Sequence, residues 1–152
     1  MQKIIPYLWF DRQAEEAANF YVSLFKNSRV ESVSRGPDGT AFLVTFHLDG
    51  QPFMALNGGP QFKFNEAFSM FVNCETQQEV DALWEKLTAD GGEESMCGWL
   101  KDKYGLSWQI IPTILVKLMN DSDLVKANRV MQAMLKMRKI DIKALEDAYA
   151  GT

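Results

Sequence analysis

The sequence passes twice through the same order of predicted elements, and this internal repeat limits the possible folds more than any other feature. In the first half, a strand near residues 4–10 precedes a helical pattern from Asp11, and three further strands are predicted at 30–35, 41–48 and 51–57. The second half repeats strand, helix and three strands from Phe68, at a period of roughly 60 residues. The chain is therefore predicted to be an α+β protein built from two β-α-β-β-β modules.

Short local signals support the individual elements. Asp11 is a candidate N-cap for the first helix, because its side chain can accept a hydrogen bond from a free backbone N–H. The dipeptide Asp49-Gly50 suits a two-residue hairpin turn. Thr76, with Glu79 three residues later, predicts a capping box at the start of the second helix.

A second hairpin is predicted over residues 97–112. Two runs rich in apolar and aromatic residues flank a polar cluster that ends in Gly105, which can supply the positive φ of a tight turn. Side chains alternate along the second arm, so Gln109 and Trp108 fall on opposite faces. One polar amide is thus predicted within an otherwise apolar strand.

Composition shifts mark the boundaries between the modules and the tail. A break at Gly58-Gly59 follows the first module, and apolar residues recur at helical spacing from Asp123, which is a candidate cap. Asp141 is the predicted cap of another short helix. The expected organisation is a first module at 1–57, a linker at 58–66, a second module at 67–113 and a C-terminal helical extension at 114–152.

Composition excludes several classes of protein. The chain has 152 residues, 47% of them hydrophobic and 24% charged, which favours a folded domain with a sizeable core. A net charge of -4 without a basic patch argues against nucleic acid and anionic membranes as partners. No segment approaches the roughly 20 apolar residues of a membrane span, and no signal peptide is recognised. Cys74 and Cys97 are expected to be reduced, so a cytoplasmic location is expected.

The repeat of two β-α-β-β-β modules resembles the vicinal-oxygen-chelate superfamily, which includes glyoxalases, bleomycin-resistance proteins and extradiol dioxygenases. Residues 6–11, 54–60 and 99–109 are more specifically similar to its PhnB-like subfamily, many members of which carry the label 3-demethylubiquinone 3-methyltransferase. Residues 127–134 and 139–142 of the tail are similar to that subfamily as well. The resemblance implies two modules that form a curved eight-stranded mixed sheet around a cavity, and it implies a homodimer.

The resemblance also implies four inward side chains that hold a divalent metal. Here the last-strand positions of the modules fall on Met54 and Gln109, and the first-strand positions fall near Pro6 and near Ala67 or Phe68. One neutral amide oxygen is far below the three or four N, O or S ligands of such sites. We therefore predict no metal site and no cofactor.

Signatures of catalysis are weak. His47 is the only histidine, and a histidine within a sheet is more often structural than catalytic. Ser69, Ser95 and Ser107 have no partner histidine that the sequence places nearby. Residues 58–60 open no convincing helix, so the Gly-rich strand-to-helix turn typical of S-adenosylmethionine-dependent methyltransferases is not supported.

Aromatic residues spread over the strands are the more suggestive feature, since one face of each strand is expected to line the cavity. An apolar pocket with a few polar groups is the usual composition of a small-molecule site. The expected function is binding of a small apolar or aromatic molecule without a metal. An enzyme of the glyoxalase or dioxygenase type, or a methyltransferase acting on a quinone-like aromatic, is the alternative, so catalysis is left open. The candidate ligand-binding residues are Gln109, Met54, Asn57, Tyr7, Trp9, Phe71 and Trp99.

Overall fold

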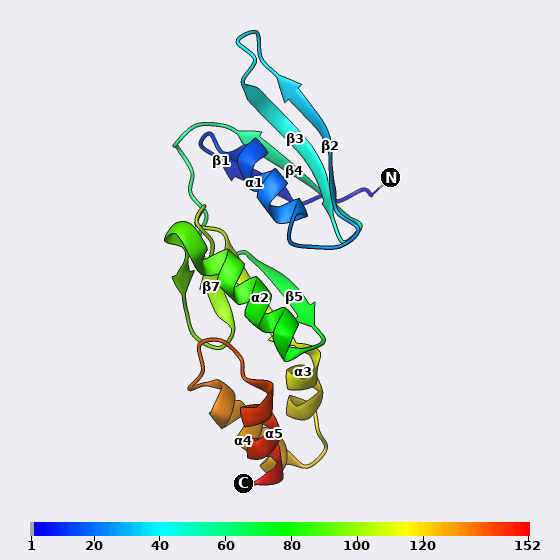
Figure 1. The fold of residues 1–152 in the computed structure, drawn as a ribbon, viewed down its shortest axis with the longest axis vertical. Helices are drawn as coiled ribbons and strands as arrows, with labels where there is room; N and C mark the ends of the chain where they lie inside the picture. The colour runs from blue at the N-terminus through cyan, green and yellow to red at the C-terminus, as the bar shows by residue number, and fades with distance from the viewer. Residues whose placement is uncertain (1) are drawn as a thin grey trace. The chain divides into compact units, whose positions relative to one another are not determined.

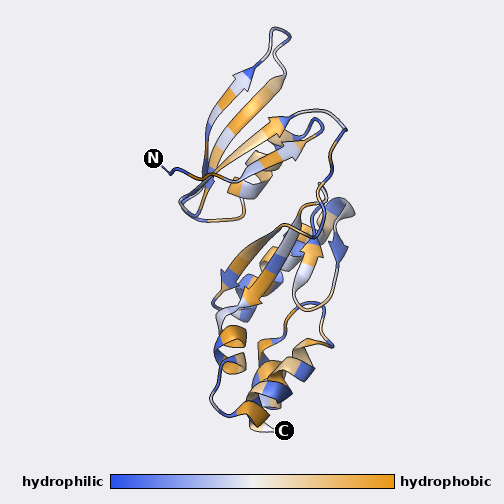
Figure 2. Cartoon of the chain, turned by 180° about the vertical axis from the view of Figure 1, so that it is seen from behind, coloured by the Kyte–Doolittle hydropathy of each residue, from blue (hydrophilic) through white to orange (hydrophobic). Residues whose placement is uncertain are grey.

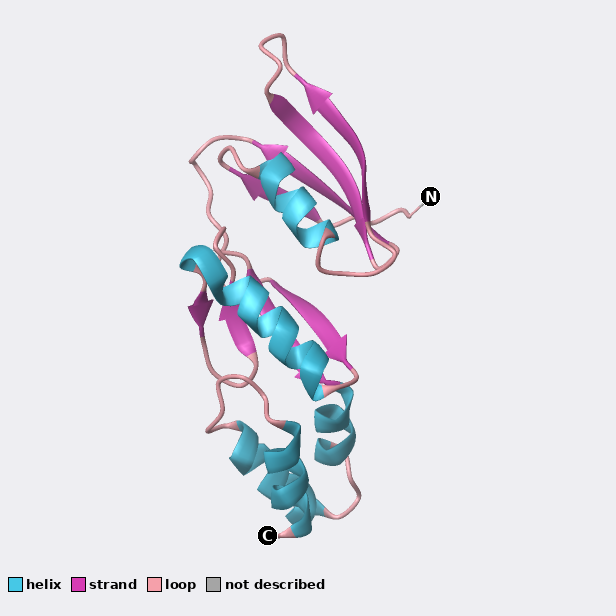
Figure 3. Cartoon of the chain, viewed as in Figure 1, coloured by secondary structure: helices cyan, strands magenta, loops and turns pink. Residues whose placement is uncertain are grey.

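A computed structural model describes residues 2–152 of the chain (Figure 1). The chain divides into two compact units, the first ending at Phe64 and the second running Asn65–Thr152. This division falls inside the predicted linker, and each unit is described here by itself. In each of them one helix lies against a four-stranded sheet (Figure 3).

The first module has the predicted β-α-β-β-β order. Its strands are paired in the order β1-β4-β3-β2, with β1 parallel to β4 and the other pairs antiparallel. Asp49 and Gly50 both have positive φ, at 47° and 80°, as a two-residue hairpin turn requires. The elements are β1 (Tyr7–Phe10), α1 (Ala14–Val22), β2 (Arg29–Arg35), β3 (Ala41–Leu48) and β4 (Gln51–Asn57).

Burial alternates along the strands of this module, which distinguishes a covered face from an open one. Side chains on the covered face pack beneath α1 and are almost fully buried, whereas their neighbours along each strand are half-buried or exposed. The covered face of the sheet and the helix stripe consist of Leu8, Phe10, Val44, Phe46, Phe53, Ala55, Ala14, Ala17, Ala18 and Tyr21.

The start of α1 differs from the sequence-based prediction. The helix begins at Ala14, and its N-cap Gln13 makes no side-chain capping bond, so the assignment of Asp11 as the cap is wrong. Asn57, at the end of β4, accepts a hydrogen bond from the Ala14 N–H at 2.8 Å instead. A tertiary contact thus satisfies a helix end that a local cap was expected to satisfy.

The second module repeats the same order. Its sheet has the strand order β5-β8-β7-β6, again with a parallel pair between its first and last strands, β5 and β8. Thr76 accepts from the Glu79 N–H at 3.2 Å, which confirms the predicted cap. The return bond to Glu79, at 2.9 Å, comes from the Glu75 N–H, one residue before the cap. The elements are β5 (Ser69–Cys74), α2 (Gln77–Thr88), the short 3-10 helix η1 (Ala89–Gly91), β6 (Glu93–Glu94), β7 (Trp99–Lys101) and β8 (Ser107–Pro112).

A buried carboxylate organises the turn between β7 and β8. Asp102 is only 2% exposed, and its Oδ1 accepts from the Tyr104 and Leu106 N–H groups at 2.8 and 3.1 Å. Its Oδ2 accepts from the indole N–H of Trp108 at 2.9 Å. The turn therefore holds Trp108 on the covered side of the sheet, and alternation directs Gln109 to the open side.

The C-terminal extension consists of α3 (Thr113–Met119), α4 (Leu124–Met134) and α5 (Ile142–Ala150). Asp123 and Asp141 cap α4 and α5 through their side chains, as predicted. In Figure 2 these helices carry hydrophobic and hydrophilic residues side by side, as expected for amphipathic helices. They share a hydrophobic core with the end of β8, formed by Ile111, Leu115, Val130, Ile140 and Leu145.

The predicted fold class is confirmed. The protein is α+β, with two β-α-β-β-β modules and a helical C-terminal extension, and the eight strands within residues 2–152 form two mixed sheets of four. Within residues 2–152, no helix has both the length and the apolar character needed to cross a membrane.

Candidate functional site

The open face of the second module brings together three of the predicted ligand-binding residues. Gln109 on β8 is paired with Phe71 on β5 and with Trp99 on β7, so the amide lies between two aromatic residues across three adjacent strands. Phe71 is 50% exposed, and Gln109 and Trp99 are half-buried. This arrangement offers two aromatic surfaces and one amide to a planar ligand.

Polar groups continue from Gln109 towards the start of β8. The Gln109 side chain donates to Ser69 Oγ at 2.9 Å, which fixes the direction of its amide. Ser107, two residues before Gln109, is 1% exposed, and its hydroxyl makes no hydrogen bond within the described part of the chain, residues 2–152. An unsatisfied buried hydroxyl costs free energy, so it is a marker of unusual local chemistry.

An ion pair lies at the same end of this face. Lys101 on β7 is paired with Ser107 in the sheet, and its ammonium group contacts the carboxylate of Glu66. The hydrogen bond from Lys101 lowers the pKa of Glu66, and the same contact raises the pKa of Lys101. Both groups are therefore charged at neutral pH.

The opposite end of the face is closed by the extension. Ile111 lies two residues beyond Gln109 on β8 and belongs to the core that α3, α4 and α5 share. The aromatic centre of the face therefore has a polar end at Ser107 and an apolar end at Ile111.

The open face of the first module carries three other predicted residues. Tyr7 is paired with Met54, and Trp9, two residues along β1, is paired with Leu56. The indole of Trp9 donates to the Gly59 carbonyl at 2.9 Å and packs edge-on against Phe62, with ring centroids 4.9 Å apart. Trp9 is thus engaged by residues of the predicted linker, and Tyr7 and Met54 are the more available pair.

Asn57 stands apart from the other predicted residues. It lies three residues after Met54, which alternation places on the opposite face of β4. Its amide donates to the Ala41 carbonyl at 3.0 Å and accepts from the Ala14 N–H. These two bonds give Asn57 a structural role at the junction of β3, β4 and α1.

His47 shares the open face of the first module, although sequence reasoning set it aside. It is paired with Pro52 on β4, and alternation places both on the side of Met54. Its Nδ1 lies 3.7 Å from the Glu31 carboxylate, beyond hydrogen-bond distance, and has no hydrogen-bond partner among residues 2–152. The two-residue spacing of Thr45 and His47 is the signal that identifies this face.

The strand register also bears on the metal site that the superfamily implies. Tyr7 is directly opposite Met54, and Phe71 is directly opposite Gln109. The first-strand positions expected near Pro6 and near Ala67 or Phe68 therefore precede the residues that face the last strands. A phenol, a thioether, a phenyl ring and an amide lack the carboxylate, thiolate and imidazole ligands that hold divalent metals in such sites. Across residues 2–152, no three His, Cys, Asp or Glu side chains are grouped to hold a metal.

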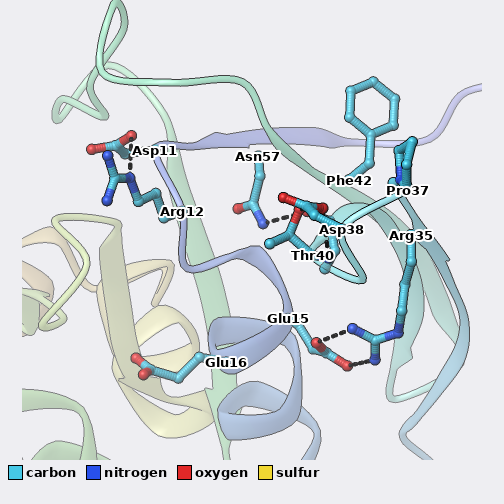
Figure 4. A pocket seen from close by; sticks show the side chains of 12 residues that line it. Asp11, Arg12, Glu15, Glu16, Arg35, Pro37, Asp38, Thr40, Phe42 and Asn57 are labelled. Atoms are coloured by element: carbon cyan, nitrogen blue, oxygen red, sulfur yellow. Dashed lines mark hydrogen bonds and ion pairs between the residues drawn. The ribbon is translucent and has the colours of Figure 1, made fainter.

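A polar hollow of about 910 Å³ lies elsewhere in the first module, beside the start of α1 (Figure 4). Arg35 forms a two-pronged ion pair with Glu15 across it, at 3.1 and 2.7 Å. Asp38 accepts two bonds from Thr40, and these bonds lower the pKa of its carboxyl. Because these charged groups satisfy one another, the hollow offers less to a ligand than the open face of the second module.

Comparisons with known proteins identify the family. The model of the 3-demethylubiquinone-9 3-methyltransferase family matches residues 2–111. The chain belongs to this family. The match covers both modules and ends at Ile111, so the extension lies outside it. No curated protein matches the chain.

Solved structures agree with this family and fold. The PhnB protein from Bacillus cereus is 40% identical, with a TM-score of 0.69 over 74% of this chain and 100% of that chain. Protein PA1353 from Pseudomonas aeruginosa shares the fold at 18% identity, with a TM-score of 0.61 over 74% of this chain and 98% of that chain.

The family's name refers to methyl transfer, and the glycines after β4 are the part of the structure that bears on it. A doubly wound sheet binds its cofactor at a Gly-rich turn between a strand and a helix. Here Gly58 and Gly59 follow β4, and no helix lies between β4 and β5. The glycines instead accommodate Trp9, because a Cβ at Gly58 would lie 2.4 Å from its indole ring.

Proposed function

We propose that this protein binds a small aromatic molecule on the open face of its second module, without the metal of the superfamily. The observation that carries the proposal is the placement of Gln109 between Phe71 and Trp99 on three adjacent strands. Aromatic surfaces provide apolar contact area, and the amide fixes the orientation of a polar substituent. The face of Tyr7 and Met54 in the first module is a second, less polar surface of the same kind.

The absence of a metal is part of the proposal. It is supported by the side chains themselves, since Met54 and Gln109 replace the carboxylates that the resemblance implies at those positions. Elemental analysis of protein purified without chelator tests it directly. A transition metal at one equivalent per chain would overturn the metal-free function.

Binding is tested with a neutral aromatic probe, naphthamide, by isothermal titration calorimetry. We expect Phe71→Ala and Gln109→Ala each to weaken binding by about three- to tenfold, because each removes an aromatic contact or a hydrogen bond. Phe42→Ala is the matched control, because Phe42 is 58% exposed and lines the polar hollow of the first module. No binding by the wild-type protein, or equal losses in all three variants, would contradict the proposal.

Methyl transfer to a quinone-like aromatic is the second candidate, and the family's printed name favours it. It requires S-adenosylmethionine as the methyl donor. Titration of the protein with S-adenosylmethionine in the calorimeter separates the two functions. Binding of that cofactor would favour the enzyme, whereas binding of naphthamide alone would favour the ligand-binding protein.

A homodimer in the cytoplasm completes the proposal. The two cysteines, Cys74 and Cys97, form no disulfide, which supports a reducing compartment. Sedimentation equilibrium tests the dimer, and a single species of 17.3 kDa would exclude it.

A further inference from the structure

The polar end of the second module's open face has an unusual local arrangement. Ser107 on β8 is paired with Ser69 on one side and with Lys101 on the other. Glu66 lies three residues before Ser69 and forms an ion pair with Lys101. The ion pair therefore joins β7, on one side of Ser107, to the segment that precedes β5, on its other side.

This ion pair is weak enough for a competing carboxylate to displace one of its partners. The side chains of Lys101 and Glu66 are 37% and 60% exposed, and ion pairs of this exposure contribute little stability because water competes with them. Lys101 is held on a strand, whereas Glu66 lies in the segment before β5. Glu66 is thus the partner that leaves more readily when another carboxylate competes for Lys101.

The buried hydroxyl supplies a second group at this place. Ser107 is 1% exposed and has no hydrogen-bond partner among residues 2–152, so it has an unused donor at the position that is paired with Lys101 in the sheet. An ammonium group and a hydroxyl together are typical carboxylate ligands. Gln109, two residues along β8, is about 7 Å away, which is close to the distance from the carboxylate of a two-ring aromatic acid to the far edge of its rings.

We propose that Lys101 and Ser107 form a carboxylate subsite for the aromatic ligand, and that Glu66 occupies this subsite when the ligand is absent. The proposal rests on the proposed function, because the ligand's ring lies between Phe71 and Trp99. The ligand's carboxylate displaces Glu66 from Lys101 and accepts a hydrogen bond from Ser107. The preferred ligands are therefore aromatic acids, and Glu66 is an internal competitor that lowers their affinity.

The test compares naphthoate with naphthamide, which have the same ring and differ in charge. We expect Glu66→Gln to tighten naphthoate binding by about three- to fivefold, the worth of an exposed ion pair, and to change naphthamide binding by less than about twofold. Lys101→Met is expected to weaken naphthoate by a similar factor and to leave naphthamide unchanged. Glu85→Gln is the matched control, because Glu85 is exposed on α2, which covers the other face.

The outcomes separate the two proposals. If the wild-type protein binds neither probe, the proposed function fails. If both probes bind but Glu66→Gln leaves the ratio of their affinities unchanged, the carboxylate subsite alone is overturned. If Glu85→Gln tightens naphthoate as much as Glu66→Gln does, the effect is one of net charge, and the subsite is likewise overturned.

Discussion

The two modules share one backbone plan and carry different chemistry at matching positions. Met54 on the last strand of the first module faces Tyr7, and Gln109 on the last strand of the second faces Phe71. Both pairs combine an aromatic residue with a side chain that stands where the superfamily resemblance implies a metal-binding carboxylate. One module has a thioether there and the other an amide, so only the second offers a directional hydrogen bond.

The modules also differ at the positions two residues before Met54 and Gln109. Pro52 in the first module is paired with His47, and Ser107 in the second is paired with Lys101. Each basic residue lies near a carboxylate, but His47 remains 3.7 Å from Glu31, whereas Lys101 and its carboxylate partner are in direct contact. The two modules therefore match in position at this point, and the second module has a direct ion pair where the first has a longer separation.

The largest expected difference between the modules lies in their last hairpins. The turn of the second module depends on the buried Asp102 carboxylate, which accepts three hydrogen bonds. Asp102→Ala leaves these donors unsatisfied and is expected to lower the free energy of unfolding by about 3 kcal/mol or more. Asp49→Ala in the first module only replaces a residue that tolerates the left-handed conformation with one that tolerates it less well. It is expected to lower the free energy of unfolding by about 1 kcal/mol. Urea denaturation measures both, and equal losses would contradict this distinction.

Two glycines of the second hairpin are expected to differ in how much stability a substitution costs. A Cβ at Gly98 would lie 2.7 Å from Ile111 Cδ1 and 3.1 Å from the Ile110 carbonyl, at a φ of +83°. Gly98→Ala therefore adds a steric clash to backbone strain, and about 2–3 kcal/mol of destabilisation is expected. Gly105→Ala has the same strain, at a φ of +86°, but meets no atom within 4 Å, so a loss of about 1 kcal/mol is expected. Thermal unfolding of the two variants checks the order.

A buried thiol gives the second module a pH dependence in the alkaline range. Cys74 ends β5 where Phe10 ends β1, and burial, with Glu79 and Glu75 nearby, raises the pKa of its thiol from 9.0 to about 12. Between these values the unfolded chain loses the Cys74 proton and the folded chain keeps it, so stability falls as the pH rises from 9 towards 12. One pH unit above the lower pKa of 9.0, the free energy of unfolding has fallen by about 1 kcal/mol. Cys74→Ala is expected to remove this part of the alkaline slope in urea titrations, and an unchanged slope would contradict it.

Sequence patterns identified most of the fold because the strong signals are local. The hairpin at Asp49-Gly50 and the caps at Thr76, Asp123 and Asp141 each depend on residues within a few positions of one another, and the structure has all of them. The start of α1 was missed for the opposite reason. Its first N–H is satisfied by Asn57, which lies 43 positions away in the sequence.

The surroundings of Gln109 likewise depend on contacts between residues that are far apart in the sequence. Alternation along one strand predicted that Gln109 opposes Trp108, but a parallel pairing between β5 and β8 decides which residue lies beside Gln109. That register joins strands separated by a helix and a hairpin, and no local pattern specifies it. For this reason Phe71 was predicted as a candidate from its aromatic character, whereas the contact of Gln109 with Ser69 and the position of Ser107 were not predicted.

The smallest expected effect concerns Ser107, whose counterpart in the first module is Pro52, a residue without a donor. Ser107→Ala removes a buried hydroxyl that has no hydrogen-bond partner within residues 2–152, so the free energy of unfolding is expected to rise by up to about 1 kcal/mol. Ser69→Ala, which breaks the bond from Gln109, is expected to lower it by a similar amount. Urea denaturation measures both signs, and a loss of stability in Ser107→Ala would show that the hydroxyl is satisfied in the folded protein. A gain in stability together with weaker naphthoate binding would mean that the serine destabilises the free protein and serves the ligand, as the carboxylate subsite requires.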